Sequence, residues 1–443
     1  MLNNVLPLSF IVGTRFFGLF IVLPVLSFYA LELQGANEFL VGLLVGVYAL
    51  TQMALQMPFG ILSDKIGRKK TMLIGLIIFI IGSLICSWAD NIYTMLIGRM
   101  LQGAGAIGAV ATAMISDFIT EENRGKAMAI MGSFIGLSFA ASMVISPLMS
   151  AKWGLSSLFD LSAVLSLLCI ILLYTVVPKE NKLTHENTKT PFFHLIKQKN
   201  LALMNFTNFM QKMLMSIAFL SIPIILVKHL GFDEHKLWIV YTASMIAGFI
   251  AMGFSGSLGE KRGLAKQILL LGIAFFILSY IFFVFSSTIT FFIVAVVIFF
   301  IGFNLHEPIM QSCASKFCKV HEKGAALGLF NAFGYGGSFI GGIIGGIFLH
   351  LNKLELLAII LVILSIVWFI ALLYLKNPSE FKNIYLPLET TLNLSEFGKN
   401  LGVVDIYKNS KNLVIKFDSK LTNKEELESK IYIKNKKNLK FDL

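Results

Sequence analysis

The chain has 443 residues, of which 56% are hydrophobic and only 14% are charged, and its mean hydropathy is +0.78. A water-soluble domain of this composition would expose large apolar patches, so the balance excludes a soluble globular protein. The formal net charge of +12 falls mostly in gaps between apolar segments, so it indicates membrane topology and attraction to anionic lipid, and we expect no nucleic-acid partner.

Twelve apolar segments follow one another along the chain. Runs of about 18 or more apolar residues predict membrane-spanning helices. The first run is too long for a cleaved signal peptide and has no basic region before it, so we expect it to be a span. The twelve runs lie near residues 5–31, 39–62, 71–88, 93–116, 126–151, 157–178, 201–227, 237–258, 267–286, 289–312, 324–349 and 354–375.

Lysine and arginine are distributed unevenly between the two sets of loops. If the N-terminus is cytoplasmic, most of the basic loop residues are cytoplasmic too. The opposite side then receives only Lys152, Lys228, Lys236 and Lys353. This is the positive-inside pattern. It predicts a multi-pass protein of the cytoplasmic (inner) membrane of a bacterium, with both termini in the cytoplasm.

The polar gap "GILSDKIGRKK", which begins at Gly60, recurs in the second half of the chain. "GSLGEKRGLAK" begins at Gly256, about 196 residues later. Arg124-Gly125 before the fifth span likewise recurs as Lys323-Gly324 before the eleventh, about 199 residues later. The sequence therefore predicts one six-helix unit used twice in parallel, an arrangement typical of secondary transporters.

Four parts follow from this repeat and from a change of composition near the end. We expect an N-terminal six-helix half over 1–178, a cytoplasmic linker over 179–200, a C-terminal half over 201–376 and a soluble domain over 377–443. The last part is polar and lysine-rich. We expect the complete fold to be an all-α polytopic membrane protein with a small α+β domain, working as a monomer.

The final domain reads as a strand in "IYLPLE", a helix in "TLNLSEFGKNL", two strands around a turn at 409–412, and a helix capped by Thr422. This order predicts a ferredoxin-like domain. A Cys-x-x-Cys motif is absent, so we expect neither a metal nor a cofactor. We expect an appendage that contributes nothing to the two helical halves; a ligand sensor is the alternative.

The polar gap itself contains two glycines and a set of charges whose positions indicate specific roles. Gly60 and Gly67 predict tight packing and a sharp turn. Asp64 lies at a helix C-terminus, where a carboxylate opposes the helix dipole and therefore needs a cation nearby. Arg68 lies four residues on, and Asp117 ends the fourth span. The alternative is a basic loop that only sets the topology.

Among the charged residues and histidines, five candidates lie deeper inside predicted spans: Arg15, Arg99, Lys212, His306 and Glu307. Because charge is costly in the bilayer, these residues are candidates for proton coupling or substrate contact. Glu307 suits a proton carrier, since a carboxyl removed from water holds a proton more readily. A nearby cation such as Arg15 or Arg99 could lower the pKa of this carboxyl when the two meet, although Arg99 could instead be held by backbone carbonyls. His306 could titrate, but as a neighbour of Glu307 it faces another side of the helix.

Three motifs carry a resemblance to a known family. "GILSDKIGRKK" resembles the best-known signature of the major facilitator superfamily, and "GRMLQGAGAIG" from Gly98 resembles its fourth-helix motif. Ser133, Ser142, Ser146-Pro147 and Ser150 have the spacing of the antiporter motif, which has glycine at most of these places. With "FNLHEP" and the final domain, the chain is similar to the YajR-like subgroup of drug:proton antiporters.

The resemblance also implies roles for particular residues. Asp64, Arg68 and Asp117, with Gly60 and Gly67, would form a gating cluster. Its charged residues would bridge helices on the cytoplasmic face, with Asp64 near the start of the eleventh helix at Gly324. Arg99 matches the arginine of the fourth-helix motif.

We therefore expect a secondary transporter that exports a small organic compound in exchange for protons. No G-x-x-x-x-G-K-[ST] loop is present, so an ion gradient would supply the energy. Its expected partners are a small-molecule substrate, protons and the lipid bilayer. Uptake of a metabolite is the alternative within transport, and a non-transporting sensor that signals through the final domain is the alternative outside it. No nucleophile–base pair or metal-ligand cluster indicates an enzyme.

Overall fold

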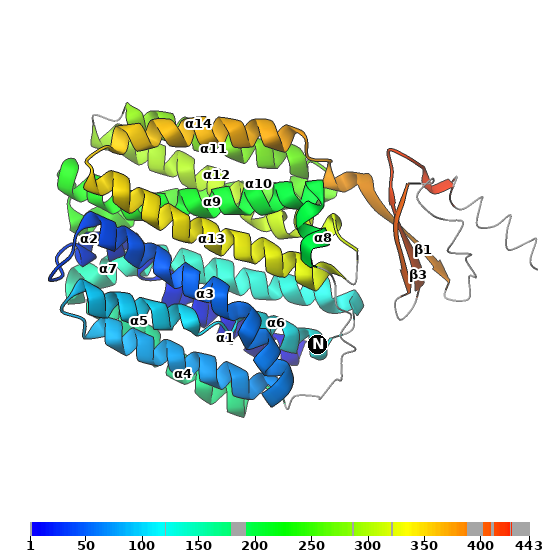
Figure 1. Ribbon diagram of the computed structural model, residues 1–443, viewed down its shortest axis with the longest axis horizontal. Helices are drawn as coiled ribbons and strands as arrows, with labels where there is room; N and C mark the ends of the chain where they lie inside the picture. Colours follow the sequence, from blue (N-terminus) through cyan, green and yellow to red (C-terminus); the bar gives the residue numbers. More distant parts are fainter. Residues whose placement is uncertain are drawn as a thin grey trace, which may run out of the picture.

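The structure is a computed structural model that describes residues 2–119, 121–178, 192–285, 288–319, 322–387, 402–408, 412–425 and 427. Long helices form one bundle, and a small sheet projects from one end, where the N-terminus also lies (Figure 1). We call this end the tail end and the opposite one the far end. The predicted helix in "TLNLSEFGKNL" and most of the predicted last helix lie outside the described residues.

Each half of the bundle is made of consecutive helices. The N-terminal half contains α1 (Leu2–Phe20), α2 (Leu23–Ala30), α3 (Glu38–Ile66), α4 (Arg68–Ser87), α5 (Ile92–Ala104), α6 (Gly108–Asp117) and α7 (Glu121–Thr175). The C-terminal half contains α8 (Phe192–Lys197), α9 (Lys199–Ile224), α10 (Leu237–Lys261), α11 (Ala265–Val284), α12 (Ile289–Lys316), α13 (Lys323–His350) and α14 (Leu354–Leu373). Short helical turns lie at Ile225–His229, Glu234–Lys236 and Pro378–Glu380.

Side-chain caps fix where several spans begin. The Asn37 side chain accepts a hydrogen bond from the Leu40 amide at 2.8 Å at the start of α3. Asn91 does the same for the Thr94 amide at 2.9 Å at the start of α5. These bonds satisfy amides that have no partner within the helix, so the apolar segments begin at defined residues.

Ten helical segments of the described chain are long and apolar enough to cross a membrane. One of them lies in α7 and covers two of the predicted spans, which meet at a kink at the non-helical residue Gly154, with φ 77°. The fourth predicted span is divided into α5 and α6, each of which is short. The twelve predicted runs thus all correspond to helices, and the differences concern where the helices break.

The break between α5 and α6 follows from glycines that allow close backbone contact. A Cβ added at Gly103 would lie 2.3 Å from the Tyr48 carbonyl oxygen in α3, and one added at Gly105 would lie 2.5 Å from the Gly75 oxygen in α4. Only glycine allows the chain to approach both helices so closely. The break leaves carbonyl groups without helical partners inside the bundle.

The two halves pack tightly at the far end. A Cβ added at Gly42 in α3 would lie 2.4 Å from the Gly342 carbonyl oxygen in α13. The Ser27 hydroxyl of α2 donates a hydrogen bond of 3.2 Å to the Phe219 carbonyl of α9. Backbone contact through glycine and hydrogen bonds between the halves therefore close this end of the bundle.

The same helices separate toward the tail end. The Met53 sulfur of α3 still lies 3.7 Å from a Cβ placed at Gly336 of α13. One or more turns further on, Gly60 of α3 and Gly324 and Gly328 of α13 have nothing within 4 Å of an added Cβ. The bundle is thus closed at the far end and open at the tail end.

The tail, which we define as the residues after 376, contains three described strands: β1 (Phe381–Pro387), β2 (Val403–Lys408) and β3 (Asn412–Asp418). The strand order is β1-β3-β2, and both outer strands run antiparallel to β3. The strands β1 and β2 are therefore parallel, with β3 between them. This arrangement is consistent with the first three strands of the predicted ferredoxin-like domain.

The tail packs on the C-terminal half, contrary to the expectation that it contributes nothing to the helices. Phe381 of β1 meets Phe317 edge to face, with ring centroids 5.5 Å apart. The Asn377 side chain donates a hydrogen bond of 3.0 Å to the Gly263 carbonyl in the α10–α11 loop. That loop is the second copy of the polar gap, so the tail is attached to one of the two repeated elements.

Candidate functional site

Lys212 and Glu307 form an ion pair inside the C-terminal half. Lys212 lies in the middle of α9 and Glu307 lies in α12, and the Lys212 ammonium contacts the Glu307 carboxylate directly. The two side chains are 26% and 34% exposed. The pair lies in the membrane-spanning part of the bundle. Water can still reach it, because the two halves are open on the tail side.

Neighbouring groups hold the Lys212–Glu307 pair. The Gln211 amide donates to the Glu307 carboxylate at 3.3 Å and to the Phe303 carbonyl at 3.3 Å. The Lys212 ammonium lies 5.0 Å from the centre of the Phe303 ring, which adds a cation–π attraction. Phe139 of α7 lies with its ring 5.8 Å from that of Phe303, so an aromatic contact joins the two halves beside the pair.

His306 is held away from this pair. Its side chain is fully buried, and its Nε2 lies 2.8 Å from the Leu269 carbonyl oxygen. The ring packs edge to face against Phe276 and Trp368 at 5.7 and 5.5 Å. These contacts make His306 part of the packing between α11, α12 and α14, as expected for a residue on another helix face from Glu307.

Arg15 donates hydrogen bonds to residues at the break in the fourth predicted span. Its Nη2 donates to the carbonyls of Gly105 at 2.9 Å and Gln102 at 3.4 Å, and to the Gln52 side chain at 2.7 Å. The negative end of a helix dipole and its unpaired carbonyls stabilise a cation. The guanidinium therefore satisfies the C-terminus of α5, which explains a buried charge in α1.

Arg99 lies beside Arg15 in the N-terminal half. It is fully buried, donates to the Gln102 side chain at 2.8 Å, and lies 4.9 Å from the centre of the Tyr48 ring. Arg15 and Arg99 were named from the sequence as cations that Glu307 could meet. The described cation that pairs with Glu307 is Lys212, since both arginines are engaged by groups of the N-terminal half.

The polar gap between α3 and α4 brings Asp64, Arg68 and Asp117 together. The Arg68 Nη1 lies 2.5 Å from Asp64 Oδ1, and its Nε lies 3.1 Å from Asp117 Oδ2. The Arg68 and Asp117 side chains are 12% and 9% exposed, whereas that of Asp64 is 61% exposed. One guanidinium thus joins the ends of α3, α4 and α6.

The two glycines of the gap differ in role. Gly67 has φ 101° and forms the sharp turn between α3 and α4, a conformation that favours glycine. Gly60, expected to allow tight packing, has nothing within 4 Å of an added Cβ, so no close helix contact requires glycine there in this conformation. The start of α13 at Gly324 is equally open, and Asp64 is largely exposed to solvent.

Several polar residues of the site were not predicted. Gln52 and Gln102 bind the two arginines, and Gln211 binds Glu307. Asn208 of α9 donates to the Phe330 carbonyl of α13 at 2.7 Å. Their signal in the sequence is an amide side chain within an otherwise apolar span, because a buried amide requires a hydrogen-bond partner.

Comparison with known proteins identifies the family. The family model of the Major Facilitator Superfamily matches residues 8–208 and 201–404. The inner membrane transport protein YajR of Escherichia coli is 33% identical over 437 residues, which cover 96% of each chain. The tetracycline resistance protein, class B, of Escherichia coli is 27% identical over 335 residues, 70% of this chain and 80% of that one.

A solved structure agrees with this assignment. The crystal structure of the nucleoside transporter NupG superposes with a TM-score of 0.69 at 14% identity and covers 84% of this chain and 99% of that one. Such a likeness shows a shared fold. With ten helical segments among the described residues that are long and apolar enough to cross a membrane, the chain is a multi-pass inner membrane protein and a transporter rather than an enzyme, and it belongs to the Major Facilitator Superfamily.

Proposed function

We propose that the chain is a proton-coupled secondary transporter that exports a small organic compound by alternating access. The observation that carries the proposal is the Lys212–Glu307 ion pair, a titratable pair within the bundle that is partly open to the tail side. Names of relatives that refer to drug resistance favour export of an organic compound.

In the proposed cycle, Glu307 binds the coupling proton. Protonation removes its negative charge and weakens the ion pair, so that Lys212 and the Gln211 amide can interact with a substrate. Loss of the proton restores the pair. A site whose occupied and unoccupied forms differ in charge can bias the two conformations of the bundle.

Asp64, Arg68 and Asp117 are proposed to act on the conformational change. If the tail end is cytoplasmic, as the basic loops predict, the present arrangement is the inward-open one. Closure of the tail end would bring Asp64 toward the N-terminus of α13, where a helix dipole stabilises a carboxylate. The exposure of Asp64 in the open arrangement supports this proposal, since its ion pair with Arg68 lies in solvent and contributes little to holding the carboxylate in place.

The test is flux driven by an imposed pH gradient. The full-length protein is reconstituted in proteoliposomes and assayed with a panel of organic compounds that includes tetracycline. Glu307→Gln should abolish gradient-driven flux while leaving exchange of substrate without a gradient. Glu355→Gln is the matched control, because Glu355 is an exposed carboxylate in the first turn of α14.

The alternatives predict other outcomes. A sensor would bind a compound without flux, and uptake would move substrate in the same direction as protons. If Glu307→Gln and wild type depend equally on the gradient, Glu307 does not couple the proton.

A further inference from the structure

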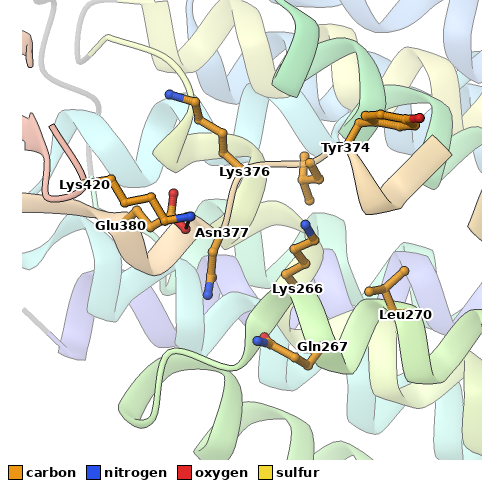
Figure 2. Close-up of a pocket in the computed structure, with 9 residues that line it drawn as sticks. Lys266, Gln267, Leu270, Tyr374, Lys376, Asn377, Glu380 and Lys420 are labelled. Atoms are coloured by element: carbon orange, nitrogen blue, oxygen red, sulfur yellow. Dashed lines mark ion pairs between the residues drawn. The ribbon is translucent and has the colours of Figure 1, made fainter. Parts of the chain in front are cut away.

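A cavity of about 450 Å³ lies where the bundle meets the tail. Residues of α11, of the connector after α14 and of the tail line it (Figure 2). It is at the tail end, away from the ion pair between α9 and α12. The lining residues are Lys266, Gln267, Leu270, Tyr374, Leu375, Lys376, Asn377, Glu380 and Lys420.

The polar part of this cavity is cationic. Lys266, Lys376 and Lys420 come from three separate segments, and Glu380 is the one carboxylate among the lining residues. Lys420 pairs with Glu380 at 2.9 Å, and Lys376 pairs at 2.8 Å with Asp418, which is not among the lining residues.

Lys266 has a different partner. Its Nζ donates a hydrogen bond of 2.7 Å to the Leu373 carbonyl, at the end of α14. In Figure 2 its side chain points toward the connector that carries Lys376 and Asn377. A carbonyl does not neutralise an ammonium, and a lysine has three donors. Lys266 therefore has charge and hydrogen-bonding capacity left for an anion in the cavity.

The other part of the cavity is apolar and continuous with the outer surface of the bundle. Leu270 and Tyr374 line it, and beyond them exposed apolar side chains cover α11 and α14, among them Leu271 at 50%, Ile366 at 43% and Ile370 at 50%. Such a surface faces lipid in a membrane protein. The cavity thus has a cationic rim on the tail and an apolar side toward the bilayer.

We propose that this cavity binds the phosphate headgroup of an acidic phospholipid. Basic pockets between membrane helices on the cytoplasmic side suit anionic headgroups, and the acyl chains would follow the apolar side of α11 and α14. The phosphate would sit between Lys266 of the bundle and Lys420 of the tail. Bound lipid would therefore strengthen the attachment of the tail, independently of what the protein transports.

The test is the thermal unfolding midpoint of the full-length protein in neutral detergent. It is titrated with dihexanoyl phosphatidylglycerol, with dihexanoyl phosphatidylcholine and with inorganic phosphate. Phosphatidylglycerol should raise the midpoint saturably and phosphatidylcholine should not. If inorganic phosphate raises the midpoint less than phosphatidylglycerol does, the ligand of the cavity is a lipid. If both raise it equally, the ligand is a free phosphate at the same site.

Variants locate the site. Lys266→Gln and Lys420→Gln should each weaken phosphatidylglycerol binding about fivefold, the effect of one lysine near an anionic lipid. Lys382→Gln is the matched control, because Lys382 is an exposed lysine of β1 outside the cavity. Glu380→Gln removes the carboxylate that competes for Lys420 and should tighten binding.

Three results would overturn the proposal. The first is no saturable shift with phosphatidylglycerol or phosphate, and the second is an equal shift with phosphatidylcholine. The third is equal binding by wild type, Lys266→Gln and Glu380→Gln. Glu380→Gln is expected to bind the lipid more tightly, so it still tests the proposal if a lysine variant fails to fold.

Discussion

The ammonium of Lys416 in strand β3 donates a hydrogen bond of 2.9 Å to the carbonyl of Cys318, at the end of helix α12. The side chain is almost completely buried, at 6% exposure. A buried lysine must be hydrogen-bonded, because an unpaired charge there would be strongly unfavourable. Lys416 therefore ties the tail to the loop that leads into α13.

Removal of the tail should destabilise the C-terminal half. A chain that ends at residue 376 loses Phe381, which packs on Phe317, and the hydrogen bond from Asn377 to Gly263. We expect the truncated protein to insert into the membrane but to lose roughly 1–3 kcal/mol of unfolding free energy. Thermal unfolding in detergent measures this. An unchanged midpoint would mean that these contacts contribute nothing.

The stability of the docked tail should rise with pH above about 8. Burial lowers the pKa of Lys416 from 10.5 to about 8, and the nearby Lys323 lowers it further, although Cys318 and Asp405 oppose the shift. Folding must therefore release a proton between pH 8 and 10.5, so that alkaline pH favours the folded form.

Lys416→Met isolates this effect, since methionine is of similar length and carries no charge. The variant loses the hydrogen bond to Cys318 at every pH, which shifts its midpoint by a constant amount. The wild type should gain stability relative to Lys416→Met between pH 8 and 10.5. A pH-independent difference between the two proteins would show that the burial of this charge does not govern docking.

Arg15→Lys should reduce stability and leave proton coupling intact. Lysine keeps the charge, but its shorter side chain cannot place an ammonium where the guanidinium holds Nη2, which donates to Gln52, Gln102 and Gly105. We expect a loss of about 2 kcal/mol of unfolding free energy, because buried acceptors lose their donor. Arg262→Lys, at an exposed position, is the control. Loss of gradient dependence at full stability would instead give Arg15 a coupling role.

Arg68→Ala should slow transport about tenfold without changing insertion, because one guanidinium joins two helix ends and biases a conformational equilibrium. If the cluster acts in the present arrangement, Asp117→Asn should slow transport more than Asp64→Asn does, because Asp64 is 61% exposed and Asp117 only 9%. Exposed ion pairs contribute little. Initial rates of flux in proteoliposomes measure this, with Lys70→Ala as control. Wild-type rates in Arg68→Ala would exclude the cluster from the cycle.

The passes of the bundle could be predicted from the sequence, because the thickness of a bilayer sets the length of each apolar run. The break between α5 and α6 could not be. "LQGAGAIGAV" has the hydropathy of a continuous span, and its glycines are equally compatible with an unbroken packed helix. The contacts of Gly103 and Gly105 with α3 and α4 determine the outcome, and these depend on the tertiary structure.

The pairing of Glu307 with Lys212 could not be predicted from the sequence for a similar reason. Arg15, Arg99 and Lys212 are all cations within spans, and a sequence gives no distance between helices. The C-terminus of α5 and two glutamines engage the arginines, which leaves Lys212 for Glu307. The attachment of the tail had one signal in the sequence, the lysine within the apolar strand "LVIKF".

The tail contacts described above all reach the C-terminal half, through Cys318, Gly263, Phe317 and the connector after α14. If the two halves rock against each other, as the proposed cycle requires, the sheet must therefore move together with the C-terminal half. A fluorophore on the exposed Lys382 and another at the tail end of α4 would convert this rotation into a change of distance. Energy transfer between them would report the conformational state of single molecules without any label in the transport path.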